Sequence, residues 1–499
     1  MTQKKLIKIL RIVGYIICGL QIIFSGLAVF MSIKLKTFPT MYIIVAGSLL
    51  LILAILFIIL QKWQIPGIIT KFLSLILSAI LVFGCFYMNY TYKRLSDMSG
   101  VKTQIDSIGV YVLADNVADD VKDLSGYTFG ILQNLDRENT EEAIKKIDEE
   151  VGEMIDTSEA ADVVALVDSL YNGEVGAIIL NGAYTGFVTS TSGYEDFNDK
   201  VKLIWTYDIE KEVKTEAEHD DYLKNTDKIF SIYVNGVDTR GKAITNSNSD
   251  VNIILTVNMN TRQILMINTP RDYYVPLSIS NGACDKLTHS GAYGIDVSIE
   301  TLEMLYGVNV DNYVRINFAG FIDIVDELGG IDVHSDYDFT APIADGETAV
   351  YSYNVGNNHL DGKQALAFAR ARHAFSDGDR QRGKNQMAVI EGVIDKLVSS
   401  ELLKNYTGIW DKVSENIVTS MPYDDIADLV KFQLEDNRGW EIIKYSVNGT
   451  DAMASTYSAG GTELYVMMPD QATIDQAKQM LKDIYEGKKI SAPAETPAQ

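Results

Sequence analysis

Arginines with phosphate-binding chemistry gather in one part of this sequence. Arg370 and Arg372 stand two residues apart, Arg382 follows soon after, and Arg271 comes directly after a predicted strand. A planar guanidinium group binds phosphate oxygens through two parallel hydrogen bonds. Several such groups in a chain of formal net charge -24 favour a site for an anion the size of pyrophosphate. The alternative is that they form solvated ion pairs with the abundant carboxylates.

The local structure decides which of these side chains can converge. If the segment around Arg370 and Arg372 is extended, both point to one side, whereas in a helix they diverge by about 160°. The helix predicted over 379–399 places Arg382 and Gln386 on one face, because residues four apart are neighbours on a helix.

Two aspartates are candidate metal ligands beside this anion site. Asp238 and Asp250 lie at predicted junctions between loop and strand. Mg²⁺ takes oxygen ligands, often only one or two protein carboxylates together with substrate phosphates. Asp is also common in turns for structural reasons, so the pair indicates a metal only in combination with the arginines. Together they suit phosphoryl transfer, in which cations neutralise charge while an acceptor attacks.

Motifs for several other chemistries are absent from the sequence. It contains no Gly-x-x-x-x-Gly-Lys-Ser/Thr loop for nucleotides and no His-Glu-x-x-His or Cys-x-x-Cys pattern for zinc. It also lacks the Gly-x-Ser-x-Gly turn of serine hydrolases. His289 and His373 could act as bases, but either could equally be a polar residue near a site.

The elements that must position these residues form an α/β unit that begins at Ile229. Gly329–Gly330 suits the end of one helix, and Asp361 suits the start of another. The apolar pattern predicts strands at 251–258 and 263–268 around a hairpin turn, and helices at 298–306, 319–328 and 379–399. We therefore expect a catalytic domain over 225–489 with its motif core at 229–400, and a disordered tail at 490–499.

A smaller α/β unit is predicted at 97–215. Asn139 and Glu142 have the spacing of a capping box, which would start a helix there. A second helix is predicted at 158–171, and strands at 109–113, 128–132, 175–180 and 201–207. No catalytic constellation is visible in this unit, so a spacer or a binding module is the preferred interpretation.

The first 96 residues predict a membrane anchor with three transmembrane helices. The uncharged stretches 12–33, 41–60 and 72–92 each approach the ~20 residues that cross a hydrocarbon core. Ten of the chain's 43 basic residues and none of its 67 acidic residues precede Asp97. The basic cluster before the first stretch favours a cytoplasmic N-terminus, and three crossings then place the chain from about residue 97 outside the cell.

The strongly acidic remainder excludes a general nucleic-acid surface, which would need clustered lysine and arginine. Cys284 is the one cysteine after the apolar stretches, so no disulfide framework is expected there.

In this order, the motifs resemble those of the LytR–CpsA–Psr family of cell-wall glycopolymer transferases. The matching segments are VNGVDTRG (234–241), SDVNIILTVN (249–258), INTPRDYYVPL (267–277), KLTHSGAYG (286–294), VDNYVRINFAGFIDIVDELGGIDV (310–333), LDGKQALAFARARH (360–373) and DGDRQRGKNQMAVI (377–390). Three spans followed by an extra α/β domain look like the capsule-associated streptococcal branch. The resemblance implies an α-β-α catalytic domain that buries a lipid chain in an apolar pocket, to which Ile253, Leu255, Ile264 and the apolar face of the 379–399 helix could contribute.

The resemblance also implies an activity and its residues. A polyprenyl-pyrophosphate-linked polysaccharide, with undecaprenyl as the lipid, is attached to peptidoglycan outside the membrane, and the lipid phosphate is released. Asp238 and Asp250 match the family's Mg²⁺ ligands, and capsule-synthesis membrane proteins are expected partners. The pyrophosphate-binding positions match Arg271, Arg370, Arg372, Arg382 and Gln386, with Lys286 and Arg380 as further polar matches. Asp272 is a candidate base for the acceptor hydroxyl.

Two other functions remain open at this point. A non-catalytic regulator of capsule synthesis would bind the lipid-linked polymer without joining it to the wall. A polyprenyl-pyrophosphate pyrophosphatase would use water as the acceptor. A capsular polysaccharide is the expected polymer, with teichoic acid or another wall glycan as the second candidate, and both a phosphodiester and a glycosidic linkage remain open.

Overall fold

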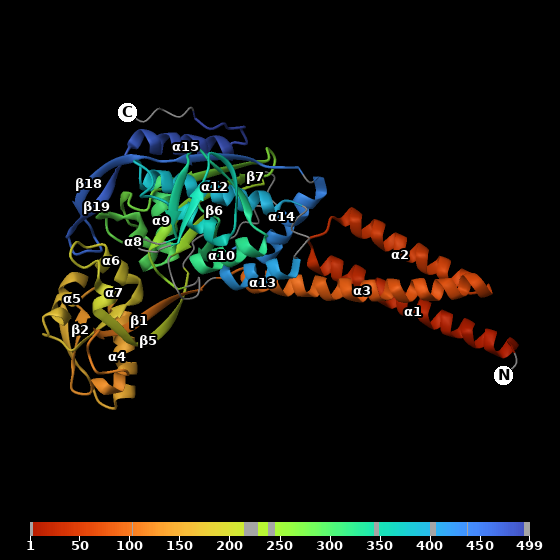
Figure 1. Ribbon diagram of the computed structural model, residues 1–499, viewed down its shortest axis with the longest axis horizontal. Coiled ribbons are helices and arrows are strands. Elements are labelled where there is room, and N and C mark those ends of the chain that lie inside the picture. Colours follow the sequence, from red (N-terminus) through yellow and green to blue (C-terminus); the bar gives the residue numbers. More distant parts are fainter. Residues whose placement is uncertain are drawn as a thin grey trace. The chain divides into compact units, whose positions relative to one another are not determined.

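The computed structural model describes residues 3–101, 103–213, 228–237, 245–343, 349–399, 406–436 and 438–493 (Figure 1). The chain forms two compact units. The first comprises Met1–Gly100, Val398–Glu415 and Met421–Gly439, and the second Val101–Leu397, Asn416–Ser420 and Trp440–Gln499. The predicted α/β class is confirmed, with three long N-terminal helices and two central sheets.

The first unit is built on three helices, α1 (Gln3–Leu35), α2 (Thr40–Leu60) and α3 (Gln64–Met98). Each is long and apolar enough to cross a membrane. The predicted spans lie inside these helices. Each helix extends beyond its span at one or both ends. Polar side chains within the bundle pair with one another, as between Ser74 and Gln21 at 2.7 Å. Such pairing removes the cost of an unsatisfied polar group in an apolar environment.

Two short helices complete this unit, α13 (Tyr406–Asn416) and α14 (Tyr423–Asp436). The Tyr423 hydroxyl donates to the Leu35 carbonyl at 2.7 Å, at the end of α1. Lys36 pairs with Asp424, and Arg94 on α3 pairs with Asp411 on α13. Ion pairs therefore hold α13 and α14 against the ends of the long helices.

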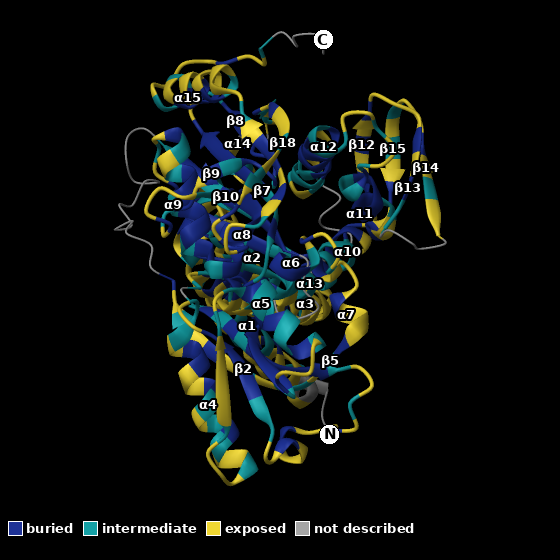
Figure 2. Ribbon diagram, turned by 90° about the vertical axis from the view of Figure 1, so that its left-hand side faces the viewer, coloured by how far each residue is buried: buried dark blue, intermediate teal, exposed yellow. Residues whose placement is uncertain are grey.

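The second unit opens with a five-stranded mixed sheet of order β3-β2-β4-β1-β5. Helices α4 (Arg137–Val151) and α5 (Val163–Tyr171) pack against it and bury two separate apolar clusters. Figure 2 shows α4 with one side buried and the other exposed. The strands are β1 (Thr103–Leu113), β2 (Thr128–Leu132), β3 (Asp156–Ala160), β4 (Ala177–Asn181) and β5 (Val201–Glu212).

Two local predictions for this sheet are wrong. The helix expected at 158–171 begins only at Val163, because Asp162 caps it by accepting from the Ala165 amide at 2.9 Å. The preceding residues form edge strand β3, paired in parallel with β2. The capping box expected at Asn139 is also absent. Helix α4 already begins at Arg137, and Asn139 lies buried within it, donating to Asp106 at 2.9 Å.

The centre of the second unit is a six-stranded sheet of order β16-β11-β6-β7-β8-β17. The predicted hairpin is confirmed: β7 and β8 are antiparallel and join through a turn in which Arg262 has φ 57°. Strands β11 and β17 pair in parallel with β6 and β8. The strands are β6 (Ile229–Val237), β7 (Ser249–Asn258), β8 (Gln263–Asn268), β11 (Asn312–Asn317), β16 (Ile417–Thr419) and β17 (Glu441–Ser446).

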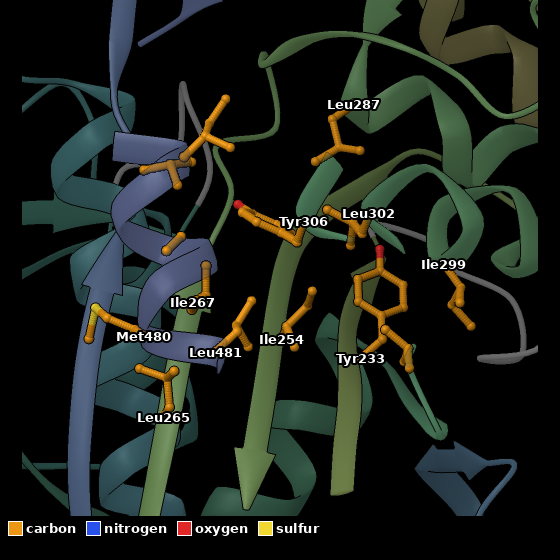
Figure 3. Packing of buried hydrophobic residues seen from close by; sticks show 14 of the residues in the cluster. Tyr233, Ile254, Leu265, Ile267, Leu287, Ile299, Leu302, Tyr306, Met480 and Leu481 are labelled. Atoms are coloured by element: carbon orange, nitrogen blue, oxygen red, sulfur yellow. The ribbon is translucent and has the colours of Figure 1, made fainter. Parts of the chain in front are cut away.

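One face of this sheet carries the largest apolar core, seen in Figure 3. Helices α8 (Leu287–Tyr293), α9 (Ile295–Tyr306) and α15 (Gln471–Tyr485) cover it. Leu302 and Leu481 from these helices are fully buried with Ile254 and Leu265 of the strands. Burying each such side chain contributes about 1.5–3 kcal/mol, so this core anchors the strand ends that carry the site.

The other face carries α10 (Phe318–Glu327), α11 (Gly362–Arg370) and α12 (Asp379–Leu397). As predicted, α10 ends at Gly329–Gly330, both with positive φ, and Asp361 caps α11 in a reciprocal capping box with Gln364. Helix α12 lies so close to the sheet that a Cβ on Gly383 would clash with the side-chain amide nitrogen of Asn268. That approach brings the polar first turns of α12 to the end of β8.

Candidate active site

The chain turns sharply after β8, and this turn presents Arg271 beside β7. The Arg271 guanidinium donates to Asp250 at 2.8 Å and lies 3.6 Å from Asp272. Burial alone would raise the pKa of Asp250, but Arg271, Arg382 and Arg370 hold it below its ordinary value. The charge of Asp250 in turn raises the pKa of Arg271 despite burial. This pair is therefore fully ionised at neutral pH.

Asp272 belongs to a second cluster with Lys286 and Asp379. The Lys286 ammonium lies 2.5 Å from the Asp272 carboxylate. The two side chains are buried, with exposed fractions of 7% and 6%. Burial opposes ionisation of Asp272, but Lys286 and Arg271 lower its pKa, and Asp379 is hydrogen-bonded to it. Burial and the charge of Asp272 raise the pKa of Asp379, against the attraction of Arg382. A proton shared by the two carboxyl groups therefore resides on Asp379.

Helix α12 delivers Arg382 and Gln386 to the same site, four residues apart as predicted. Arg382 donates to Asp379 at 2.8 Å. Burial and the neighbouring charge of Arg271 lower the pKa of Arg382, although Asp379 opposes this. Crowded buried guanidinium groups repel one another, and a bound anion would relieve that repulsion.

The helix boundary of α11 resolves how Arg370 and Arg372 are arranged. Arg370 is the last residue of α11, and Ala371 has φ -59° and ψ 119°, so the helix ends between them. Both arginines line the same cavity as Arg271 and Arg382. The Arg370 guanidinium lies 4.5 Å from the centre of the Phe318 ring, and Arg372 donates to His373 at 3.1 Å.

The cavity that these residues line has a volume of about 660 Å³. Besides the four arginines, Asp250 and Gln386, it is lined by a set of apolar side chains from α10, α11, α12 and strand β13 (Phe339–Pro342) with its following residue. These are Phe318, Phe321, Phe339, Ile343, Leu366, Val389 and Ile390. A cavity with both linings suits an amphipathic ligand that joins a phosphate group to a hydrocarbon chain.

The other predicted residues are divided between the cavity lining and the surrounding structure. Lys286 and Arg380 do not line the cavity; Arg380 instead donates to Asn448 at 2.7 Å. His289 is fully buried and bonded to Asp285 at 2.7 Å, whereas His373 lines the cavity. Of the apolar residues proposed for the lipid, the α12 face contributes Val389 and Ile390. Ile253, Leu255 and Ile264 belong to the sheet interior and do not contribute.

Asp379 also belongs to this site, although the sequence motifs do not predict it. It stands three residues before Arg382 in the segment DGDRQR, in which the arginines alone indicate anion binding. Its spacing places it one helical turn from Arg382, where an ion pair is expected. Its contact with Asp272 depends on the fold, since the two residues are far apart in sequence.

Asp250 is the candidate Mg²⁺ ligand within the part of the chain that the structure describes. Asp250 fits, because it is ionised, lines the cavity and lies among the groups that would hold phosphates. Asp238 lies outside the described residues. Within the described ranges no three acidic, histidine or cysteine side chains form a metal cluster. A Mg²⁺ ion held by only one or two protein carboxylates usually completes its coordination with substrate phosphates and water.

Comparison with known proteins gives consistent matches. A model of the LytR_cpsA_psr family matches residues 196–483, more than half of the chain. The Enterococcus faecalis protein named polyisoprenyl-teichoic acid–peptidoglycan teichoic acid transferase TagU is 34% identical over 204 residues, which are 40% of this chain and 65% of that protein. TagU of Bacillus anthracis is 32% identical over 251 residues, covering 50% of this chain and 77% of that protein.

Solved structures give weaker similarity. A crystal structure of Bacillus subtilis TagV matches with a TM-score of 0.42 and 26% identity, over 52% of this chain and 98% of that one. A Streptococcus agalactiae protein matches with a TM-score of 0.45 and 28% identity, over 57% and 96%.

Proposed function

This chain belongs to the LytR–CpsA–Psr family, and we propose that it transfers a polyprenyl-pyrophosphate-linked glycopolymer onto peptidoglycan. The observation that carries the proposal is the composition of the cavity. Four arginines and Gln386 line it together with aromatic and aliphatic side chains. A lipid pyrophosphate is the ligand that matches both linings, because the guanidinium groups bind its phosphates and the apolar residues bind its chain.

The reaction proposed is a phosphoryl transfer. The acceptor hydroxyl oxygen bonds to the phosphorus that carries the polymer, and the bond from that phosphorus to the bridging oxygen breaks. The lipid leaves as its monophosphate, and the polymer becomes joined to peptidoglycan through a phosphodiester. Arg271, Arg370, Arg372 and Arg382 would neutralise the charge that develops on the phosphate oxygens.

Proton transfer is assigned to the carboxyl pair. The acceptor hydroxyl must lose its proton as it attacks, and Asp379 is the better acceptor because its pKa is raised whereas that of Asp272 is lowered. Asp272 would hold Lys286 and Arg271 in place and keep Asp379 basic. A Mg²⁺ ion bound by Asp238 and Asp250 would supply further positive charge to the phosphates.

Location follows from the first unit. Three helices long and apolar enough to cross a membrane, preceded by a basic N-terminal cluster, support a catalytic unit on the outer side, where peptidoglycan lies. As the polymer we propose a capsular polysaccharide, on the likeness of three spans plus an added α/β domain to the capsule-associated branch. The curated relatives are named for teichoic acid, which is the second candidate.

The test is a reconstituted reaction. The full-length protein in detergent would be incubated with lipid-linked capsular polymer, Mg²⁺ and a peptidoglycan oligomer, and parallel reactions would use lipid-linked teichoic acid. The proposal predicts polymer joined to the oligomer and lipid monophosphate released. Free polymer with phosphate at its end would indicate a pyrophosphatase instead, and an unreacted donor that nevertheless binds would indicate a non-catalytic regulator.

A further inference from the structure

The cavity accounts for the donor but leaves the approach of the acceptor open. Asp250 and the four arginines line the cavity, whereas Asp272, Lys286 and Asp379 do not. A lipid-linked donor that fills the cavity therefore leaves the carboxyl pair to be reached by another path. The elements that surround this pair outside the cavity should form the acceptor site, because the attacking hydroxyl must come within hydrogen-bonding distance of its base.

One element is attached directly to this carboxyl pair, the hairpin of β18 (Gly449–Ser455) and β19 (Glu463–Pro469) (Figure 1). The Met467 amide donates to the Asp272 carbonyl at 2.7 Å. The next two residues add side-chain bonds, since Tyr273 donates to the Asn448 carbonyl at 3.0 Å and Tyr274 to the Ser455 carbonyl at 2.7 Å. Hydrogen bonds thus join the hairpin to Asp272 and to the two residues that follow it.

The hairpin presents apolar and polar groups to solvent. Met453 and Tyr465 are directly opposite each other in its register and are 60% and 41% exposed. Side chains directly opposite on one face of an antiparallel pair lie in contact distance, so these two form one surface. Exposed aromatic and methionine side chains are enriched where other molecules bind.

Polar contacts connect this surface to the carboxyl pair. The Tyr465 hydroxyl donates to Asp451 at 3.1 Å, and Arg380 from α12 pairs with the same carboxylate at 3.0 Å. The Lys286 ammonium, which holds Asp272, lies 5.9 Å from the centre of the Tyr465 ring. Burial, Asp451 and the charges of Asp272 and Asp379 raise the pKa of Tyr465 to about 12, so its hydroxyl remains a donor.

We propose that the exposed face of the β18–β19 hairpin, formed by Tyr465, Met453 and Asp451 with Arg380, binds the acceptor glycan strand of peptidoglycan. The inference rests on the proposed function. A sugar ring has an apolar face that packs on an aromatic ring and hydroxyl and amide edges that bond to groups such as Asp451 and Arg380. A lipid chain would need an enclosed apolar site, which the donor cavity already provides.

The far end of the hairpin is also fixed, which suits a surface that must position a hydroxyl. The Ser458 amide donates to buried Asp285 at 2.7 Å, and Tyr293 donates to the Ser458 hydroxyl at 3.0 Å. A Cβ on Gly460 would lie 2.6 Å from the Cβ of Asp162, at the start of α5 in the smaller sheet domain. The hairpin tip therefore lies directly against the residue that caps α5.

The test separates acceptor binding from donor chemistry in the full-length protein. Tyr465→Ala and Met453→Ala should each raise the KM for a peptidoglycan oligomer by about tenfold or more, the loss expected for a central anchor residue. Affinity for the lipid pyrophosphate should change less than about twofold. Met304→Ala, an equally exposed methionine on α9, should change neither quantity. Tyr465→Phe separates ring from hydroxyl and should give an intermediate KM.

A direct titration of the oligomer, without donor, distinguishes this inference from the proposed function. If the wild-type protein binds the oligomer and Tyr465→Ala weakens that binding, the titration supports the acceptor surface even where no transfer is detected. An unchanged oligomer affinity and KM in both variants, with an unaltered thermal midpoint, would overturn the inference while leaving the transferase intact. A parallel loss of donor affinity would also overturn it.

Discussion

At the scale of residues, the site consists of two charged clusters that begin at adjacent positions of the chain. Arg271 faces Asp250 and the cavity, while its neighbour Asp272 faces Lys286 and Asp379. Under the proposed function, one short turn after β8 would therefore contribute both to anion binding and to proton transfer. We therefore expect replacement of Arg271 to impair stabilisation of the phosphate charge and replacement of Asp379 to impair proton transfer.

Replacing Arg271 tests the anion site. Arg271→Ala should lower kcat/KM for transfer by about 10²–10³, because a preorganised donor to the phosphate charge is lost. Arg137→Ala removes an arginine that pairs with Glu141 on the surface of α4 and should leave transfer unchanged. Steady-state kinetics with lipid-linked polymer measure both, and an equal effect of the two substitutions would refute the assignment.

Replacing Asp379 tests the proton acceptor. Because its pKa is raised above 3.8, its basic form is lost at a higher pH than for an ordinary aspartate as the pH falls. The log of kcat should therefore rise with pH on the acid side and then level off. Asp379→Asn should remove this limb and lower kcat by about 10²–10⁴.

Asp377 is the matched control for Asp379, since it is exposed and lies two residues upstream. Asp377→Asn should retain both the rate and the acid limb. An acid limb that persists in Asp379→Asn would assign the base elsewhere.

The chemistry of single residues could be predicted only in part. A guanidinium group suits phosphate binding wherever it lies, so the sequence alone predicts Arg271 and Arg382 as candidates, and both line the cavity. The position of Arg372 relative to Arg370 could not, because it depends on where α11 ends. Asp379 becomes notable only through Asp272, a contact that the fold creates between distant segments.

At the scale of elements, α12 joins the polar and apolar parts of the cavity. Its first turns carry Arg382 and Gln386, and Val389 and Ile390 follow on the same lining. Ile390→Asp should weaken binding of a long-chain polyprenyl pyrophosphate by about 10- to 100-fold, because burial of such a side chain contributes about 1.5–3 kcal/mol. Binding of a short-chain pyrophosphate should change little. Leu397→Asp, at the exposed end of α12, is the control, measured by the same titrations.

The start of α4 carries a titratable group unrelated to the site. Burial and the charge of Asp106 raise the pKa of Asp136 to about 7, against hydrogen bonds from Asn181 and Asn139. The unfolded carboxyl ionises near 3.8, so between these values only the folded state binds the proton. The free energy of unfolding should therefore fall as pH rises from 4 to 7, by about a few kcal/mol.

Thermal unfolding of the detergent-solubilised protein between pH 5 and 8 measures this effect. Asp136→Asn should flatten the decline of the thermal midpoint with pH, and Asn also tolerates the φ of 56° at this position. Asp199→Asn, an exposed substitution in the same domain, should leave the slope unchanged. An identical slope in Asp136→Asn would show that another group is responsible.

The boundaries of these elements show which local signals are reliable. Asp361 and Gly329–Gly330 mark helix ends correctly, because a cap acts through neighbouring residues. The helix expected at 158–171 fails at its start, because pairing of 156–160 with β2 outweighs the local pattern. Pairing between strands joins residues that are distant in the chain, so a local sequence pattern does not predict it.

At the scale of the whole molecule, three apolar helices and an acidic α/β unit share one chain. Length and composition alone predict the helices, since a hydrocarbon core requires such stretches. The side of the membrane rests on the charge bias and can be measured. In a Cys284→Ala background, Lys489→Cys on intact cells should react with a membrane-impermeant maleimide, whereas Lys5→Cys should not. The reverse labelling would contradict an external catalytic unit.

The fate of the two donor phosphates distinguishes phosphoryl transfer to peptidoglycan from glycosidic transfer and from hydrolysis. A lipid-linked polymer labelled with ³²P only in the phosphate attached to the polymer would be incubated with the full-length protein, Mg²⁺ and a peptidoglycan oligomer. The account predicts the label in the joined polymer–peptidoglycan product and unlabelled lipid monophosphate. Label that stays with the lipid as pyrophosphate would show a glycosidic linkage, and label on free polymer would show hydrolysis. Either result would contradict phosphoryl transfer to peptidoglycan.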